Sequence, residues 1–414
     1  MRKAGTDKNQ EPVNGKSEQL KIFSIAAAHM FNDWYMNYIQ TLLPFLIAAG
    51  LGVSRGAFLI SAFTITSSLL QPVFGYLVDQ KNQRWMVYAG TLWMAVLLSL
   101  VGILNSYPLQ LLTVTCAGLG TAAFHPQASA MVTAVSGSRK GFFQAFFIAA
   151  GNVGWAFTPL MVVPFTQKYG LQMTPISVLP GFLVAVLLWF TAPKISTGSR
   201  AVSLPFWPAI RSAWTELTKI VLVVSFRSMA YFGLVSFLAL YLQHKNIPLL
   251  TGSRLLFLML FSGAAGGLAG GYLSDLFGRK IVIVGSLVLA SPLFYLFLNT
   301  GAPLSYLFLA LAGASLLASF SVTVVAAQEV ISRHAAMAAG LMLGFGIGIG
   351  GLGVGLVGLL VENKGIVFAI NFLICLPLIA GILGLTIRKA PSTGSTVEGA
   401  STCENSESGT LSFN

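Results

Sequence analysis

The sequence has little charge. Asp, Glu, Lys and Arg make up only 9% of its residues, against about 25% in a typical soluble domain. In addition, 55% of the 414 residues are hydrophobic, and they recur in long uninterrupted runs. The two observations together exclude a soluble globular protein. A spanning helix needs ~20 apolar residues, whereas the strands of a membrane barrel alternate over ~10 residues. The continuous runs therefore predict an all-α membrane protein.

Several chemical signatures are also missing. The three cysteines, Cys116, Cys375 and Cys403, are too few for a disulfide framework and have no metal-binding spacing. The stretch Gly344–Gly355 contains Gly-x-Gly-x-x-Gly, but no strand precedes it, so it predicts close helix packing rather than a nucleotide site. There is no Walker loop, metal cluster or nucleophile triad, so we expect neither an enzyme nor an ATP-driven pump, and no metal or organic cofactor. The polar first nineteen residues predict that there is no cleavable signal peptide.

Two copies of one turn divide the chain. Gly75–Arg84 and Gly271–Lys280 begin 196 residues apart, and each ends an apolar run with Gly-Tyr-Leu-x-Asp and has a base nine residues after the glycine. A repeat at nearly half the chain length indicates a duplicated architecture. The turn resembles the loop between the second and third helices in each half of a major facilitator transporter. We expect the charged side chains of both copies to form latches at the cytoplasmic edge.

The apolar runs predict twelve transmembrane helices in two halves of six. They span roughly residues 20–49, 54–78, 85–104, 108–132, 141–165, 175–192, 218–242, 254–273, 281–298, 303–331, 340–361 and 365–387. The predicted organisation is a tail (1–19), an N-terminal six-helix bundle (20–192), a polar linker (193–217), a C-terminal six-helix bundle (218–388) and a disordered tail (389–414).

The bases fall mainly on one side of this arrangement. With both tails cytoplasmic, eighteen of the twenty-four Lys and Arg lie in cytoplasmic segments and five in outer loops, while Arg227 lies inside a helix. This asymmetry satisfies the positive-inside rule. It predicts a multi-pass protein of the cell (inner) membrane with both termini cytoplasmic. It also explains most of the net charge of +12 without a nucleic-acid partner.

Only two acids, Asp33 and Glu329, remain inside predicted helices, where an ionisable group by default indicates a substrate or ion pathway. Asp33 lies about 16 Å from the inner end of its helix, near the midplane of a core about 30 Å thick. It belongs to a polar stripe within roughly 140° of one helix face, formed by His29, Asn32, Asp33, Asn37 and Gln40. The stripe is either an interhelical hydrogen-bond seam or the lining of a water-filled cavity.

Three further polar positions each allow two interpretations. Pro126 is expected to kink its helix, which places His125 either in the cavity or against the carbonyl that the proline frees. Arg227, about 10 Å inside the inner boundary, either snorkels to that boundary or binds an anionic substrate group or a membrane acid. Glu329 is nearer the cytoplasm than His125, and it forms either a gate ion pair with a cytoplasmic base or a substrate contact.

These motifs together resemble those of the fosmidomycin resistance protein family. The resemblance covers nearly all of residues 20–388. It rests on His29-x-x-Asn32-Asp33, Gln71-Pro72, Phe124-His125-Pro126, Gly151-Asn152, Arg227-Ser228 with Tyr231-Phe232-Gly233, and Ala327-Gln328-Glu329. It implies a twelve-helix major facilitator fold and efflux driven by the proton gradient. Fosmidomycin is a small phosphonate, and such an anion would suit a cavity that contains Arg227.

The chain departs from the superfamily pattern at two places. Asn82 stands in the first turn where the pattern has glycine, as Gly278 does in the second, and the fifth predicted helix has Thr158-Pro159 where antiporters often show Gly-Pro. Proton-coupled import, or sugar export on the same fold, therefore remains an alternative. A non-transporting membrane sensor is the alternative of another class, and the lack of a folded tail domain argues against it.

We predict an alternating-access secondary transporter that exports a small anionic or polar compound, such as a phosphonate antibiotic or a metabolite, in exchange for protons. It is expected to work as a monomer in the lipid bilayer. The expected proton-coupling residues are Asp33, His29 and His125. The expected substrate-binding residues are Asn32, Asn37, Gln40, Phe124, His125, Gln144, Asn152, Arg227, Tyr231 and Gln328. The expected gating residues are Asp79, Arg84, Asp275, Arg279, Lys280, Glu329 and Arg333.

Overall fold

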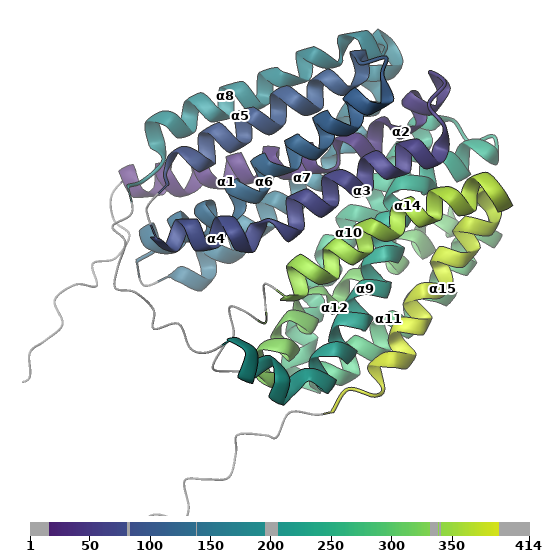
Figure 1. The fold of residues 1–414 in the computed structure, drawn as a ribbon. Coiled ribbons are helices and arrows are strands. Elements are labelled where there is room, and N and C mark those ends of the chain that lie inside the picture. Colours follow the sequence, from purple (N-terminus) through teal and green to yellow (C-terminus); the bar gives the residue numbers. More distant parts are fainter. Residues whose placement is uncertain are drawn as a thin grey trace, which may run out of the picture.

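The computed structural model describes residues 16–80, 83–137, 139–194, 206–331, 338 and 341–388, which contain helices and no strand (Figure 1). The N-terminal half contains α1 (Lys16–Met36), α2 (Tyr38–Ala48), α3 (Val53–Leu69), α4 (Gln71–Gln80), α5 (Trp85–Leu100), η1 (Val101–Ile103), α6 (Tyr107–Val135), α7 (Lys140–Tyr169), η2 (Leu171–Ser177) and α8 (Val178–Thr191). The C-terminal half contains α9 (Phe206–His244), α10 (Leu249–Phe277), α11 (Arg279–Asn299), α12 (Leu304–Val330), η4 (Leu341–Gly346), α14 (Ile347–Lys364) and α15 (Ile366–Gly384).

These helices form the twelve predicted spans. α1 and α2 together make the first span, α3 and α4 the second, and η4 with α14 the eleventh. Ten of the spans are long and apolar enough by themselves to cross a membrane. The other two are the first span and α6, which carry the three residues that were predicted to couple protons. The prediction of an all-α, multi-pass membrane protein is confirmed.

Two of the predicted helices are discontinuous. The first is interrupted at Asn37, whose backbone leaves the helical region and whose side-chain Nδ2 donates a hydrogen bond to the Trp155 carbonyl of α7 at 2.9 Å. The second is interrupted at Leu70. The interruption at Asn37 falls within the polar stripe of the first span, so it places backbone and side-chain polar groups together near the middle of the membrane.

The predicted linker 193–217 is partly helical, because α9 begins at Phe206 rather than near residue 218. Glu216 lies within this early part of α9. It forms ion pairs with Lys219 at 2.7 Å and with Arg388 at 3.7 Å, which connect the start of α9 to the residues that follow α15. The predicted N-terminal tail is likewise shorter, since α1 begins within it.

The two halves meet at one end and diverge at the other. Figure 1 shows α2 and α14 near the closed end, whereas α4 and α12 lie apart at the opposite end. The halves touch mainly through α3 against α14 and α7 against α10. At the closed end, the Ser54 N–H of α3 donates to Glu362 Oε1 of α14 at 2.8 Å. The structure is therefore an open-at-one-end state of a two-part bundle.

The contact between α3 and α14 depends on glycine. The Ser61 hydroxyl donates to the Gly351 carbonyl at 2.7 Å and accepts from the Gly355 N–H at 2.9 Å. A Cβ at Gly351 would lie 2.6 Å from Thr64 Cβ, and one at Gly355 would lie 2.9 Å from the Phe58 ring. The close helix packing that was predicted for this glycine-rich stretch is confirmed.

Candidate functional site

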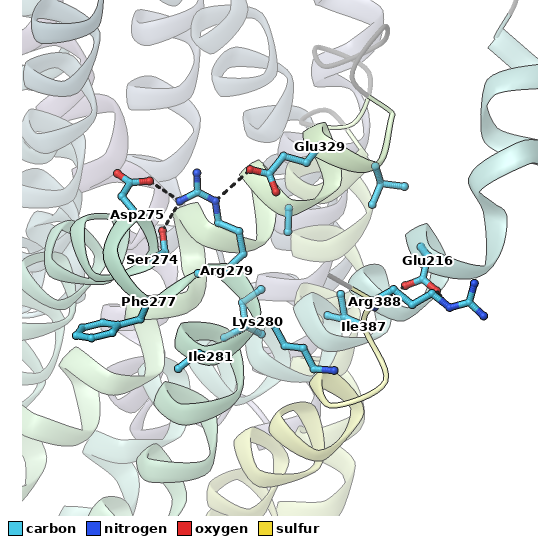
Figure 2. Close-up of a pocket in the computed structure, with 14 residues that line it drawn as sticks. Glu216, Ser274, Asp275, Phe277, Arg279, Lys280, Ile281, Glu329, Ile387 and Arg388 are labelled. Carbon is cyan, nitrogen blue, oxygen red and sulfur yellow. Dashed lines mark hydrogen bonds and ion pairs between the residues drawn. The ribbon is translucent and has the colours of Figure 1, made fainter. Parts of the chain in front are cut away.

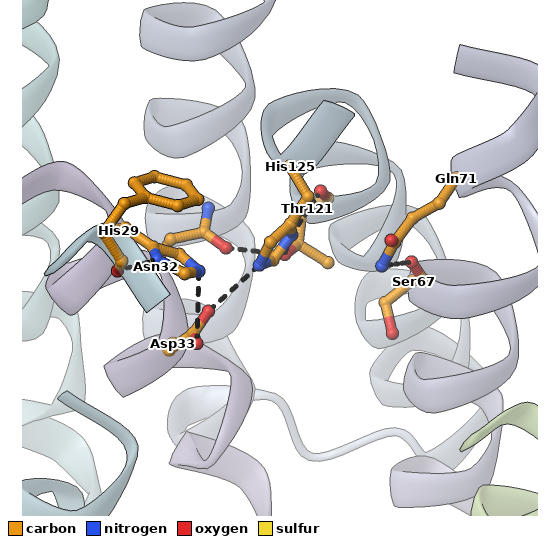
Figure 3. Close-up of polar contacts among 8 residues, drawn as sticks. His29, Asn32, Asp33, Ser67, Gln71, Thr121 and His125 are labelled. Atoms are coloured by element: carbon orange, nitrogen blue, oxygen red, sulfur yellow. Dashed lines mark hydrogen bonds and ion pairs between the residues drawn. The ribbon is translucent and has the colours of Figure 1, made fainter. Parts of the chain in front are cut away.

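Two histidines and one aspartate form a cluster inside the N-terminal half (Figure 3). Asp33 Oδ1 is 3.1 Å from His125 Nε2 of α6, and Asp33 Oδ2 is 3.4 Å from His29 Nε2 of α1. The three side chains are 15%, 20% and 7% exposed respectively, so little water screens the interactions between them. The structure thus brings together all three residues that were predicted to couple protons.

Helix geometry and one glycine create this cluster. His29 and Asp33 are four residues apart on α1 and therefore share a face. α7 covers them at Gly151, where a Cβ would lie 2.5 Å from Asp33 Oδ2 and 2.5 Å from His29 Cε1. Side chains do not approach one another so closely, so α7 can pack here only because residue 151 is glycine.

Backbone carbonyls anchor both imidazole rings. His29 Nδ1 lies 2.7 Å from the Phe147 carbonyl oxygen, and His125 Nδ1 lies 3.0 Å from the Thr121 carbonyl oxygen. A carbonyl oxygen can only accept a hydrogen bond, so a proton on Nδ1 satisfies each contact. Both Nε2 atoms then face the carboxylate of Asp33. Each of these two contacts needs one proton to be favourable, so the carboxylate provides two positions at which a proton can be shared.

The position of His125 differs from one of its two predicted environments. The carbonyl that Pro126 leaves without a helical donor belongs to Ala122, four residues earlier. His125 instead contacts Thr121 and Asp33. The prediction that the imidazole binds the freed carbonyl is therefore wrong, and its partner is the carboxylate of another helix.

The inner part of the polar stripe is an interhelical seam. Asn32 is fully buried, and its Oδ1 accepts a hydrogen bond from the Thr121 hydroxyl at 2.6 Å. Asn32 Nδ2 has no hydrogen-bond partner among the described residues. Phe124 is also fully buried, and its ring is stacked on His29 with the centroids 6.1 Å apart. Asn32 and Phe124 thus contact the cluster from inside the protein.

The outer part of the stripe has unused acceptors. Asn37 Oδ1 and Gln40 Oε1 are buried, and neither has a partner in the part of the chain that the structure describes. Asn37 also binds the Trp155 carbonyl, and the Trp155 ring stacks on Tyr231 of α9 with the centroids 6.3 Å apart. Trp155 therefore connects the interruption of the first span to the other half of the molecule.

Arg227 of α9 is a buried cation. Its side chain contacts Ser228 Oγ through Nη2 at 3.4 Å, and its guanidinium carbon lies 4.7 Å from the centroid of the Phe320 ring. The residue is 2% exposed, so the prediction that it snorkels to the boundary is wrong. Its Nε and Nη1 have no hydrogen-bond partner among the described residues, and no described carboxylate lies within 4.0 Å of it. A buried ion without a paired opposite charge is costly, so an anion bound beside Arg227 would be stabilising.

Three predicted substrate residues lie away from the cluster. Gln144 donates to Ser129 Oγ of α6 at 2.7 Å. Asn152 is exposed on α7, although its neighbour Gly151 contacts the cluster. Gln328 is half-buried on α12. The structure does not place these three side chains with Asp33.

The predicted gating residues of the second turn form an ion-pair network (Figure 2). Arg279 of α11 contacts Asp275 Oδ1 of α10 at 2.5 Å and Glu329 Oε1 of α12 at 3.2 Å. These residues line a cavity of about 620 Å³ that Lys280 and Arg388 also line. Glu329 thus pairs with a base, one of its two predicted roles. All of these residues belong to the C-terminal half, so in this conformation the network joins helices of one half.

The first turn is only partly described. The guanidinium of Arg84 donates a hydrogen bond to the Trp189 carbonyl at the end of α8. The side chain of Asp79 and the whole of Arg333 lie outside the described residues. The predicted pair between Asp79 and Arg84 therefore stays a prediction.

The central cluster could also accept a metal ion. The donor atoms of His29, Asp33 and His125 all lie within 4.8 Å of one another. The sequence predicted no metal site, and the effect of a chelator on transport would distinguish the two possibilities.

Known proteins share this sequence pattern and this fold. A family model described as the Major Facilitator Superfamily matches residues 23–326. The chain belongs to the Major Facilitator Superfamily. It is 29% identical over 364 residues to the fosmidomycin resistance protein of Escherichia coli (strain K12), covering 86% of this chain and 90% of the relative. It is 30% identical over 382 residues to YfnC, an uncharacterised MFS-type transporter of Bacillus subtilis (strain 168), covering 87% and 91%. The predicted resemblance is confirmed, and the chain is a transporter rather than an enzyme.

Solved structures of this superfamily have the same fold. A bacterial homologue of the human lysosomal transporter Spinster, in an inward-facing and unoccupied conformation, aligns with a TM-score of 0.74 and 16% identity over 92% of this chain and 100% of its own. A mutant of the nucleoside transporter NupG aligns with a TM-score of 0.74 and 14% identity over 90% and 100%. The predicted major facilitator fold is confirmed.

Some residues around the cluster could not be recognised from the sequence. Thr121 could have been recognised, because it lies one helical turn before His125 and can therefore reach its ring. Gly151 was noted only as part of a motif, and nothing in the sequence showed that its missing side chain makes room for Asp33. The role of the Phe147 carbonyl could not be predicted, because every residue has a backbone carbonyl and the residue type does not distinguish this one.

Proposed function

We propose that the chain is an alternating-access secondary transporter that exports a small anionic compound in exchange for protons. Arg227 is the observation that carries the proposal. A guanidinium that is 2% exposed and lacks a carboxylate partner in the described chain needs an anion to balance its charge. In a transporter of this superfamily, the substrate is the natural source of that anion.

The form of the cation narrows the substrate class. A guanidinium presents five N–H groups in a planar fork that matches the oxygens of carboxylates, phosphates and phosphonates. Phe320 covers one face of the Arg227 guanidinium, so an anion would approach one of its edges. The name of the Escherichia coli relative supports a phosphonate such as fosmidomycin as the first probe.

The cluster around Asp33 is proposed to carry the proton. Its carboxylate faces two imidazole nitrogens within 3.4 Å, and this arrangement binds protons in a poorly screened environment. Tyr231 lies one helical turn after Arg227 on α9 and stacks on Trp155, whose carbonyl binds Asn37 in the polar stripe of Asp33, so packed residues connect the two sites. The proton site lies in one half and Arg227 lies in the other, so reorientation of the halves changes both together.

Electrostatics determines how the two sites communicate. Within any one conformation, a proton on the cluster removes negative charge near Arg227 and strengthens anion binding, which taken alone favours co-transport. Exchange then requires the protonated carrier to return to its cytoplasm-facing state without the anion. With the tails on the cytoplasmic side, as the distribution of Lys and Arg predicts, the diverging end in Figure 1 opens to the cytoplasm. That is the state in which an exporter takes up its substrate.

Transport by the purified protein in proteoliposomes tests the proposal, with fosmidomycin as the probe and an imposed pH gradient. The wild type should move fosmidomycin against the direction of proton flow. Asp33→Asn should lose gradient-driven transport but keep exchange of labelled for unlabelled probe across the membrane. Arg227→Gln should lose both, and Arg254→Gln, which removes an exposed cation from α10, should lose neither.

Three outcomes would contradict parts of the proposal. Full gradient-driven transport by Asp33→Asn would show that this carboxylate does not couple protons. Movement of probe and protons in the same direction would show co-transport and not exchange. Loss of transport on addition of a chelator, with recovery on addition of a divalent metal, would show that the cluster binds a metal ion.

A further inference from the structure

Thr121 contacts the proton cluster through two different oxygen atoms. Its hydroxyl oxygen lies 2.6 Å from Asn32 Oδ1 and 3.1 Å from His125 Nδ1. Its carbonyl oxygen lies 3.0 Å from the same Nδ1. Thr121 and Asn32 are both fully buried, so no bulk water competes for these groups. Figure 3 shows Thr121 beside His125 on the side of the ring away from Asp33.

Two hydrogen-bond arrangements fit these positions. When His125 carries a proton on both ring nitrogens, Nδ1–H donates to the Thr121 carbonyl, Nε2–H donates to Asp33 Oδ1, and the Thr121 hydroxyl donates to Asn32. When the Nδ1 proton has left, the hydroxyl turns and donates to the bare Nδ1. The Asn32 amide then rotates by half a turn and donates Nδ2–H to the Thr121 hydroxyl oxygen.

The unpartnered amide of Asn32 supports this alternation. In the first arrangement Asn32 Nδ2 has no acceptor among the described side chains and backbone, and a buried N–H without a partner is costly. In the second arrangement Nδ2 gains the Thr121 oxygen, while Oδ1 loses its donor. One hydrogen bond therefore replaces another, and neither protonation state of His125 leaves its Nδ1 without a partner.

We propose that Thr121, together with Asn32, is a positioning pair that keeps His125 hydrogen-bonded whether its ring is charged or neutral. The inference rests on the proposed proton coupling. It adds that the proton which the cluster gains and loses is the one on His125 Nδ1, while the Nε2 proton stays in the contact with Asp33. Only that N–H bond breaks and re-forms, and the ring gains or loses one positive charge.

Few other ionisable groups surround His125. His29 and Asp33 of α1 face it directly. On the other helices that pack against α6, the charged residues lie near the helix ends. The hydrogen bonds at Thr121 are therefore the main local control on the Nδ1 proton.

Nitrogen NMR of the protein with ¹⁵N-labelled histidine tests this inference, because the chain has only four histidines. The His125 signal is assigned with a His125→Gln variant, and its shifts distinguish a bare from a protonated Nδ1. In the wild type, the neutral ring should have a bare Nδ1. In Thr121→Val the titration midpoint of His125 should move upward by about 0.4 to 1 pH unit, which corresponds to one buried hydrogen bond. The reason is that valine keeps the carbonyl that serves the charged ring and lacks the hydroxyl that serves the neutral ring.

Thr121→Ser is the matched control, since it retains the hydroxyl and should titrate like the wild type. A neutral wild-type ring with its proton on Nδ1 would overturn the inference, and this measurement requires no Thr121 variant to fold. An unchanged midpoint in Thr121→Val would also overturn it. The NMR signals do not depend on transport, so failure of the proposed exchange would appear separately, in the Asp33→Asn transport assay.

Discussion

Replacing Gly151 by alanine should separate proton coupling from substrate movement. The added methyl carbon would lie 2.5 Å from Asp33 Oδ2 and 2.8 Å from His29 Nδ1, whereas an ordinary contact is 3.4–4 Å. The side chains must therefore move by about 1 Å, and such overpacking typically costs about 1–3 kcal/mol. Displacement of His29 also weakens its hydrogen bond to the Phe147 carbonyl, worth about 0.5–1.5 kcal/mol. The higher helix propensity of alanine returns up to about 1 kcal/mol.

The net effect is a loss of about 1–3 kcal/mol of stability, and the displaced carboxylate and imidazole lose the geometry in which they bind a proton. We expect gradient-driven transport of fosmidomycin to fall at least tenfold in Gly151→Ala proteoliposomes. Exchange of labelled for unlabelled probe without a gradient should fall much less, because Arg227 lies on the other half. Thermal unfolding in detergent should show a lower midpoint than the wild type.

Gly285→Ala provides the matched control. It makes the same substitution within α11, where an added Cβ would meet no atom within 4 Å. It should leave transport unchanged, and its thermal midpoint should not fall, because alanine has the higher helix propensity. If Gly151→Ala kept full gradient-driven transport and the wild-type midpoint, the close approach of α7 would not matter to the cluster, and this reasoning would be refuted.

Two further predictions concern the ends of the bundle. Glu362→Ala removes the carboxylate that caps the N-terminus of α3 from the other half, worth about 1 kcal/mol, so the closed end should open about fivefold more often. Spin-label distances between α3 and α14 would measure this opening. Asn363→Ala is the control, because the Asn363 side chain donates its hydrogen bond to Leu359 of the same helix. An unchanged distance distribution in Glu362→Ala would count against a role for Glu362. Asp275→Ala should slow transport only a few-fold with substrate affinity nearly intact, because Asp275 is 68% exposed and Arg279 keeps Glu329. A large loss of affinity alone would contradict a gating role.

Hydropathy was sufficient to predict the membrane fold. Lipid-facing surfaces must be apolar and every backbone group must be satisfied within the helix, so the twelve spans can be seen in the composition of the runs. The interruption at Asn37 could not be predicted, because it depends on the Trp155 carbonyl of a different helix. The early start of α9 could not be predicted either, because Arg211 and Glu216 gave this stretch the composition of a polar linker.

The candidate site could be predicted only where the spacing along a single helix, or the cost of a single charge in the membrane, indicated a residue's role. Spacing along α1 placed His29 and Asp33 on one face, and the cost of an ionisable group in the membrane drew attention to both Asp33 and Arg227. The sequence did not show that His125 would reach Asp33 and not the freed carbonyl, because that contact depends on how α6 packs against α1. Nor did it show that Arg227 is buried, because snorkelling depends on whether neighbouring helices cover the side chain.

The contact between α3 and α14 has a consequence for how readily the molecule can reorient. On the α14 side it is formed largely by the main chain at Gly351 and Gly355, held by one serine hydroxyl. Glycine has no rotamers to freeze, so separating or re-forming this surface changes little side-chain entropy. The two halves can therefore separate and re-form this contact with little reordering of side chains, and the same closed geometry can be restored in every transport cycle.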